Sequence, residues 1–139
     1  MMNPAQERLI LHHIKPSVQR LSIMNYLLQN RTHPTADMIF NELYVSMPTL
    51  SRTTIYNTLK LLVEEKAIQM ITIDEKNARY DADTSIHAHF KCKGCGEIFD
   101  VPVSGIEGIT LQADERFITD EVQLYCRGYC KKCLENNHI

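Results

Sequence analysis

The sequence has no long apolar segment and no targeting signal. No stretch of it approaches the roughly 20 consecutive apolar residues that a membrane-spanning helix needs. The N-terminus has no basic stretch followed by an apolar run, which a secretory signal would show. Internal repeats and low-complexity segments are also absent from the sequence. We therefore expect a cytoplasmic protein that does not act at a membrane.

The chain also lacks an excess of positive charge. It contains 15 Lys and Arg against 17 Asp and Glu, which gives a formal net charge of −2. With 44% hydrophobic and 23% charged residues, it has the composition of a folded globular protein. Its 139 residues suffice for one domain of usual size or for two small ones. Any contact with a nucleic acid would have to come from a local patch, because the overall field does not attract an anion.

Helical signals dominate the first half of the chain. The apolar periodicity and the N-cap residues predict three helices: over residues 17–29 with Ser17 as the cap, from Thr35 onward, and over residues 51–66. Two short strands are then predicted, over residues 68–73 and 79–81, joined by a polar turn. Three helices followed by a hairpin are typical of a winged helix-turn-helix. We predict this domain over residues 1–82.

The pattern changes after a short polar link at residues 82–86. The second half predicts strands over residues 87–92 and 97–101, a helix over residues 104–115, and a further strand region over residues 117–127. The chain is therefore predicted to have an α+β fold, with a second small domain over residues 83–139. Cys126 alternates with apolar neighbours in the last strand region, which favours a buried thiol over a redox-active one.

Four of the five cysteines occur in two close pairs, Cys92 with Cys95 and Cys130 with Cys133. A Cys-x-x-Cys turn places two thiolates on one metal ion, and zinc takes four such ligands in a tetrahedral array. Residues 96–129 separate the pairs, so the ion would join the end of the chain to the start of the second domain. In a reducing compartment, paired cysteines more often bind metal than form disulfides. We predict a structural zinc site, with a redox dithiol or free thiols as the alternative.

A second set of metal-binding residue types lies close to the first cysteine pair. His87 and His89 project to the same side of a strand, Asp100 follows on the next strand, and Asp81 ends the earlier hairpin. A mixed set of nitrogen and carboxylate ligands suits Fe²⁺, Mn²⁺ or Zn²⁺. The alternation of two histidines also fits side chains that simply face solvent. On local evidence alone, His33 is an ordinary loop histidine.

Several motifs occur together and in a fixed order. They are the segment His-Pro-Thr-Ala-Asp at residues 33–37, the helix Ser-Arg-Thr-Thr-Ile-Tyr-Asn-Thr-Leu at residues 51–59, His87-x-His89-x-x-Cys92-x-x-Cys95, and Cys130-x-x-Cys133. In this combination the chain resembles the ferric uptake regulator family of bacterial metal-dependent repressors, over about residues 15–134. The resemblance implies a winged-helix DNA-binding domain, a C-terminal α/β dimerisation domain, a structural four-cysteine zinc and a regulatory metal site in the hinge.

The resemblance also implies which residues hold the regulatory metal: His33, Asp81, His87, His89 and Asp100. His33 would come from the DNA-binding domain, so that metal and DNA favour the same interdomain geometry. In having aspartate at position 100, the chain resembles the peroxide-responsive subgroup of the family. Many iron sensors of the family have glutamate there. The resemblance therefore implies Fe²⁺, with Mn²⁺ as an alternative corepressor and Zn²⁺ as a further one. Peroxide would then oxidise His33 or His87, and the metal and the DNA would be released.

The third predicted helix carries the candidate DNA face. Its polar stripe can donate hydrogen bonds at every position, and comprises Thr53, Tyr56, Asn57 and Lys60. We expect Tyr56 to touch a thymine methyl group and Asn57 to pair with adenine. Phosphate contacts are expected from Arg52 and Lys60, with further ones from Lys15 and Arg20. A homodimer would place two such helices on an A/T-rich pseudo-palindromic operator. The alternative is a merely solvated face, and the nearby acidic residues Glu64 and Glu65 do not strengthen DNA binding.

Three other functions compete with a peroxide-responsive repressor. A plain iron or zinc sensor would share every feature except the response to peroxide. A hydrolytic metalloenzyme would need an open coordination position and a neighbouring general base, and no spare Glu or His lies beside the cluster in the sequence. A zinc-containing protein-interaction module would not bind DNA. We therefore expect no enzymatic activity and no small-molecule substrate.

Overall fold

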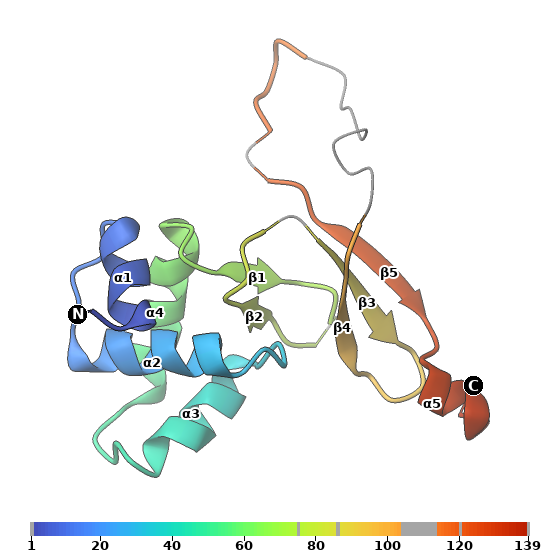
Figure 1. The fold of residues 1–139 in the computed structure, drawn as a ribbon, viewed down its shortest axis with the longest axis horizontal. Coiled ribbons are helices and arrows are strands. Elements are labelled where there is room, and N and C mark those ends of the chain that lie inside the picture. Colours follow the sequence, from blue (N-terminus) through green and yellow to red (C-terminus); the bar gives the residue numbers. More distant parts are fainter. Residues whose placement is uncertain (1, 75, 86, 104–113, 120, 139) are drawn as a thin grey trace. The chain divides into compact units, whose positions relative to one another are not determined.

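A computed structural model of the chain describes residues 2–74, 76–85, 87–103, 114–119 and 121–138. The chain divides into two compact units, Met1–Thr84 and Ser85–Ile139 (Figure 1). Helices and a small hairpin form the first unit, and a three-stranded sheet with a short helix forms the second. The predicted α+β fold is therefore confirmed. None of the helices in the described residues is long and apolar enough to cross a bilayer.

Local capping residues determine where the helices of the first unit begin. The helices are α1 (Pro4–Leu11), α2 (Val18–Gln29), α3 (Ala36–Tyr44) and α4 (Arg52–Glu64). The hydroxyl oxygens of Ser17, Thr35 and Ser51 each accept a hydrogen bond from the backbone N–H three residues later, at 3.2, 3.2 and 3.1 Å. These bonds satisfy N–H groups that have no partner within the helix. The predicted starts of α2, α3 and α4 are thus confirmed.

Helix α1 was not predicted, although local signals for it are present. The Asn3 side chain accepts a hydrogen bond from the Gln6 N–H at 2.8 Å, and Pro4 occupies the first helical position. Both features favour a helix start. The helix buries only Ala5 and Leu9, so its apolar periodicity is weak in the sequence.

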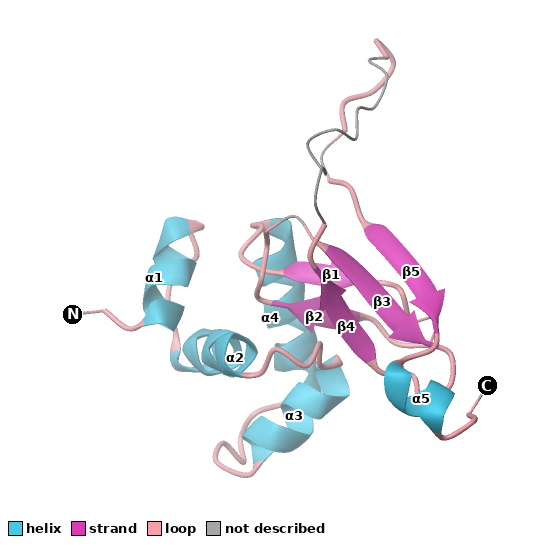
Figure 2. Ribbon diagram, turned by 45° about the vertical axis from the view of Figure 1, so that its right-hand side comes forward, coloured by secondary structure: helices cyan, strands magenta, loops and turns pink. Residues whose placement is uncertain are grey.

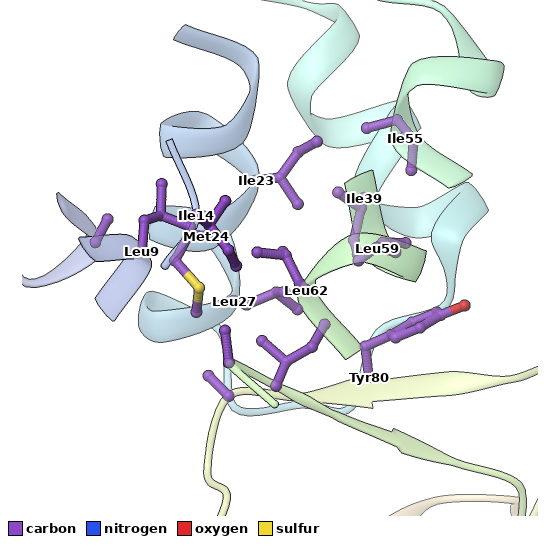
Figure 3. Close-up of a cluster of buried hydrophobic side chains, with 14 of the residues drawn as sticks. Leu9, Ile14, Ile23, Met24, Leu27, Ile39, Ile55, Leu59, Leu62 and Tyr80 are labelled. Carbon is purple, nitrogen blue, oxygen red and sulfur yellow. The ribbon is translucent and has the colours of Figure 1, made fainter. Parts of the chain in front are cut away.

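One hydrophobic core unites the helices of the first unit (Figure 3). Ile55, Leu59 and Leu62 from α4 are fully buried, in agreement with the apolar periodicity that predicted this helix. They meet apolar side chains from α2 and α3. The opposite side of α4 is left exposed to solvent. Helices α3 and α4, with the turn between them, form the helix-turn-helix.

Helix α4 leads into the hairpin of β1 (Gln69–Ile71) and β2 (Arg79–Asp81). The strands are antiparallel, with Met70 opposite Tyr80. Strand β1 is shorter than the predicted 68–73 because only the three residues of β2 pair with it. The turn between the strands contains an Asp74 carboxylate that accepts the Lys76 N–H at 3.0 Å. This hairpin is the wing that the sequence predicted.

The second unit is built on a mixed sheet (Figure 2). Strand β3 (Ala88–Cys92) lies in the centre, antiparallel to β4 (Ile98–Val101) and parallel to β5 (Leu124–Gly128). The short helix α5 (Lys131–Glu135) follows β5 directly. Strands β3 and β4 lie within the predicted ranges 87–92 and 97–101, whereas helix α5 was not predicted.

Three details of the second unit differ from the sequence-based predictions. Most of the predicted helix at residues 104–115 lies outside the described residues, and Asp114 and Glu115 do not form a helix. The strand predicted over residues 117–127 begins only at Leu124, because Leu124 pairs with Ala88, the first residue of β3. Cys126 is exposed rather than buried. It lies on an edge strand, where alternation in the sequence does not reveal whether either face is covered.

Candidate metal centres and nucleic-acid interface

The four paired cysteines meet in the second unit. Cys92 ends β3, Cys95 lies in the turn that follows, and Cys130 and Cys133 lie at the start of α5. Their four sulfur atoms all lie within 4.8 Å of one another, and the Sγ atoms of Cys95 and Cys130 are 3.9 Å apart. Sulfur ligands about 2.3 Å from a tetrahedral zinc ion are separated by about 3.8 Å. The geometry therefore fits one zinc ion held by four thiolates, and does not fit disulfides.

Backbone N–H groups stabilise a negative charge on Cys92. Its sulfur accepts hydrogen bonds from the N–H groups of Cys130 and Gly94, both at 3.3 Å, and of Cys95 at 3.5 Å. These donors, with that of Cys130 foremost, lower the pKa of Cys92 to about 6. Burial and the neighbouring thiols instead raise the pKa of Cys133 to about 12. Without an ion, Cys92 therefore favours the thiolate and Cys133 the neutral thiol. A divalent cation bound to the cluster would stabilise all four cysteines as thiolates.

Gly94 is the residue that permits the cysteines to come this close. A Cβ atom at this position would lie 2.7 Å from the Cys133 sulfur and 2.6 Å from the His138 carbonyl oxygen. Both distances are shorter than van der Waals contact allows. The position directly before Cys95 in the Cys-x-x-Cys turn is therefore restricted to glycine by its neighbours.

The second unit also gathers the histidines with Asp100. His89 lies opposite Asp100 in the register of β3 and β4, and His87 precedes β3. The Nε2 atoms of His87 and His89 lie 3.1 and 3.3 Å from the same oxygen, Oδ1 of Asp100. With its proton on Nδ1, His87 donates to the Ser85 carbonyl at 2.8 Å and directs the Nε2 lone pair towards Asp100. Such a backbone partner commonly orients a metal-binding imidazole.

The first unit contains a smaller set of the same kind. The Nε2 atom of His33 lies 3.4 Å from Oδ2 of Asp81, at the end of β2. The other carboxylate oxygen of Asp81 accepts the Asp83 N–H at 2.9 Å. In this unit one imidazole nitrogen therefore faces one carboxylate oxygen. In the second unit two imidazole nitrogens face one carboxylate oxygen. Nitrogen and carboxylate oxygen ligands suit harder divalent cations, whereas sites made of thiolates alone suit softer ones.

Helix α4 presents the predicted polar stripe to solvent. Thr53, Tyr56, Asn57 and Lys60 are all exposed. Tyr56, Asn57 and Lys60 line a shallow groove together with Met70 of β1 and Tyr80 of β2. The exposed stripe and the wing hairpin thus form a continuous surface in the first unit, of the kind that places a helix in the major groove.

The predicted phosphate-binding residues differ in whether their side chains contact other groups of the protein. Lys15 and Lys60 are exposed, whereas Arg20 donates a hydrogen bond to the Lys15 carbonyl at 2.8 Å. The Arg52 guanidinium lies 2.8 Å from the Asp37 carboxylate and 4.4 Å from the centre of the Phe40 ring. Asp37 and Phe40 both belong to α3, whereas Arg52 is the first residue of α4. The Arg52 side chain is therefore held against the preceding helix of the helix-turn-helix.

Sequence reasoning did not identify Asp37 and Arg79 as partners of candidate site residues. In the sequence, Asp37 was noted only as part of the segment at residues 33–37, yet it lies in the first turn of α3 and binds Arg52. Arg79 donates a hydrogen bond to the His33 carbonyl, across 46 positions in the sequence. No local pattern could reveal such a long-range pair. A carboxylate among basic and polar residues of a helix-turn-helix was, however, a visible signal at Asp37.

Comparisons with known proteins agree with this geometry. The Ferric uptake regulator family model matches residues 12–127. The chain is 30% identical over 131 residues to the peroxide-responsive repressor PerR of Staphylococcus epidermidis, which covers 90% of this chain and 85% of that protein. A solved structure of PerR from Streptococcus pyogenes, described as a structural basis for peroxide sensing and gene regulation, is 30% identical with a TM-score of 0.51. It covers 92% of this chain and 89% of that one. The ferric uptake regulator of Pseudomonas aeruginosa, solved with manganese, shares the fold at 18% identity with a TM-score of 0.73, over 93% of this chain and 99% of that one.

A winged helix followed by a mixed sheet with clustered cysteines, matched over most of its length, defines a metal-dependent transcriptional regulator and not an enzyme. The chain belongs to the ferric uptake regulator family. Regulators of this family bind DNA operators as dimers.

Proposed function

We propose that the protein is a peroxide-responsive repressor that uses Fe²⁺ as its regulatory ion, with Mn²⁺ as an alternative corepressor. One divalent ion would take His33, Asp81, His87, His89 and Asp100 as its ligands. The observation that carries the proposal is the convergence of imidazole Nε2 atoms on carboxylate oxygens, on Asp100 in one unit and on Asp81 in the other. A metalloenzyme is excluded by the family to which the chain belongs.

The division of these ligands between the two units provides the regulatory mechanism. We take residues 1–82 as the DNA-binding domain and residues 83–139 as the dimerisation domain. An ion that uses ligands from both domains stabilises one arrangement of the domains over others. Operator DNA selects the arrangement in which both reading helices of a dimer fit successive major grooves. Metal and operator therefore raise each other's affinity by the same factor.

The DNA-binding role is assigned to the exposed face of α4. Tyr56 and Asn57 are the proposed base-reading residues, and Thr53, Lys60 and Lys15 would contact the backbone. Arg52 reaches a phosphate only when the phosphate competes with Asp37 for the guanidinium. The proposed target is an A/T-rich pseudo-palindrome bound by a homodimer. The protein would act in the cytoplasm, where the bacterial chromosome lies.

The structural zinc is assigned to Cys92, Cys95, Cys130 and Cys133. The sulfur separation and the three backbone donors to Cys92 support this assignment. Because this cluster is contained in the second unit, its ion would stabilise that unit rather than report a signal.

The response to peroxide is assigned to His33 and His87. His33 and His87 would hold Fe²⁺, which would catalyse the two-electron reduction of peroxide by one of these rings. In the net reaction, one oxygen atom is added to a ring carbon of His33 or His87, and the other leaves as water. The oxidised imidazole is a poorer ligand, so the ion is released and the two domains are no longer held together. The peroxide-responsive relatives at about 30% identity support this assignment.

The proposal is tested with purified zinc-loaded protein and a duplex containing an A/T-rich palindrome. Gel-shift experiments with Fe²⁺, Mn²⁺ or Zn²⁺ should each show binding that the metal-free protein lacks. Low peroxide should abolish binding of the Fe²⁺-loaded protein within minutes and leave the Mn²⁺-loaded protein bound. Mass spectrometry should then find one added oxygen on the peptide of His33 or His87.

Two outcomes would contradict the proposal in different ways. If peroxide leaves the Fe²⁺ complex intact and adds no oxygen, the protein is a metal sensor only. If no divalent ion changes DNA binding, the regulatory metal site itself is wrong. The Mn²⁺-loaded protein serves as the control for oxidation that does not depend on bound iron.

A further inference from the structure

Arg79 of β2 connects two parts of the first unit that are distant in sequence. Its Nε and Nη2 atoms donate hydrogen bonds to Oδ2 of Asp74, at 3.2 and 3.1 Å. Its remaining terminal nitrogen, Nη1, donates to the carbonyl oxygen of His33 at 3.2 Å. One rigid guanidinium thus spans the turn of the wing and the loop that precedes α3. Planar geometry makes arginine suited to hold two partners at fixed positions.

Asp74 uses its two carboxylate oxygens for two different purposes. Oδ1 accepts the Lys76 N–H and closes the turn of the wing, while Oδ2 binds Arg79. The Asp74 and Arg79 side chains are only 11% and 18% exposed, so the pair is less screened by solvent than a surface ion pair. The conformation of the wing turn and the position of the Arg79 guanidinium are therefore linked.

His33 needs such support because its backbone is unusual. Its φ angle is +57°, in the left-handed region that residues with a side chain rarely adopt. A residue held in this region is strained, and the surrounding structure must offset that strain. The adjacent segment is fixed as well, because the Pro34 carbonyl accepts the Tyr80 N–H at 3.0 Å. Strand β2 thus determines where the backbone of His33 lies, and hence where its imidazole can point.

We propose that Arg79 is a positioning residue, which holds His33 for the regulatory metal and links this ligand to the turn of the wing. The inference rests on the proposed function, since it takes His33 as a metal ligand. Partners that orient a ligand from behind typically change metal affinity by roughly 10–100-fold when they are removed. Because linkage is reciprocal, an ion at His33 stabilises the wing turn to the same extent that the ordered turn favours the ion.

The test uses the full-length zinc-loaded protein and Mn²⁺. This ion is chosen because it binds to sites for divalent cations but does not react with peroxide. Isothermal titration calorimetry would measure the Mn²⁺ dissociation constant of the wild type and of Arg79→Met, Asp74→Asn and the double variant. Asp74→Asn retains an acceptor for the Lys76 N–H but loses the charge that binds Arg79. Arg116→Met is the matched control, because Arg116 binds the Asp114 carboxylate through Nε and Nη2 in the other unit.

Arg79→Met should weaken Mn²⁺ binding by about tenfold, within the range for partners that orient a ligand. Asp74→Asn should weaken it less, and the double variant should match Arg79→Met, because Asp74 is proposed to influence His33 through Arg79. Arg116→Met should bind as the wild type does. Zinc content and circular dichroism should be unchanged in all variants, which separates an effect on the ligand from a loss of fold.

Binding of Mn²⁺ by Arg79→Met within twofold of the wild type would overturn the inference, even if the variant melts at a lower temperature. Independent, additive effects of the two substitutions would also overturn the Asp74 link. If Arg79→Met does not fold, Arg79→Lys replaces it, and an affinity equal to that of Arg116→Met would then refute the role. Failure of the wild type itself to bind Mn²⁺ would refute the proposed regulatory site, and the inference with it.

Discussion

The two sets of metal ligands share one strand, yet they are built on different principles. Strand β3 carries His89 near its start and Cys92 at its end. The sulfur ligands are completed entirely by neighbouring turns and by α5 within the second unit. The proposed nitrogen and oxygen ligands are split, with two residues in the first unit and three in the second. Under the proposed assignment, a structural ion has all its ligands in one unit, whereas the regulatory ion has ligands in both.

The difference has a thermodynamic reason. Binding to ligands of a single unit adds to the stability of that unit, and such structural zinc contributes on the order of 10 kcal/mol in small domains. Binding to ligands of two units adds to the stability of one arrangement of the units, as proposed for the histidine and aspartate set. Thiolates suit a permanent ion, whereas nitrogen and carboxylate ligands suit ions whose occupancy varies.

The largest effect is expected from breaking the sulfur site. Cys95→Ser removes one of four thiolates and should cause loss of zinc and of the folded dimer together. Zinc analysis would measure the bound metal, circular dichroism the fold, and analytical ultracentrifugation the dimer. Retention of one zinc per chain with a native dimer would show that Cys95 is not a ligand.

A smaller and more selective effect is expected from the other ligand set. His87→Ala should abolish Mn²⁺-stimulated DNA binding, with a loss of Mn²⁺ affinity greater than the roughly 10–100-fold that an orienting partner contributes. Zinc content and thermal unfolding should remain close to those of the wild type, and calorimetry with gel shifts would check both statements. An unfolded His87→Ala protein would contradict the division into a structural and a regulatory site.

A moderate gain of function is expected at the DNA face. Asp37→Asn frees the Arg52 guanidinium and removes a carboxylate from the helix-turn-helix, so operator binding should become several-fold tighter. The slope of log affinity against log salt should steepen by about 0.9, as for one added phosphate contact. Glu42→Gln on the same helix is the control for charge alone. Weaker binding by Asp37→Asn would instead mean that Asp37 holds Arg52 in its DNA-binding position.

The smallest effect is expected at the fifth cysteine. Cys126 is exposed on β5 and does not belong to the sulfur cluster, so Cys126→Ser should retain one zinc per chain and bind DNA within twofold of the wild type. The same zinc assay and gel shift would measure it beside Cys95→Ser. A loss of zinc here would contradict the assignment of the four ligands.

Much of the candidate site was predictable because its signals are local. The cysteine pairs, the alternating histidines and the amphipathic stripe of α4 are each contained in a few consecutive residues. The burial of Cys126 and the length of the last strand were predicted wrongly. Both depend on which strands become neighbours, and β5 pairs in parallel with a strand about 36 positions earlier in the chain, as the register of Ala88 with Leu124 shows.

The amino-acid sequence by itself determined the helix starts, because Ser17, Thr35 and Ser51 each cap an N–H group only three residues away. It also determined the donor chemistry of both ligand sets, because the residue types set the metals that each can take. Only the tertiary structure decided how these parts support one another. The bond from Arg79 to the His33 carbonyl, the approach of Cys133 to Gly94 and the pairing of Arg52 with Asp37 join residues that are not neighbours in sequence. Such contacts form only when the packed core brings separate segments together, and no local pattern of residues specifies which partners will meet.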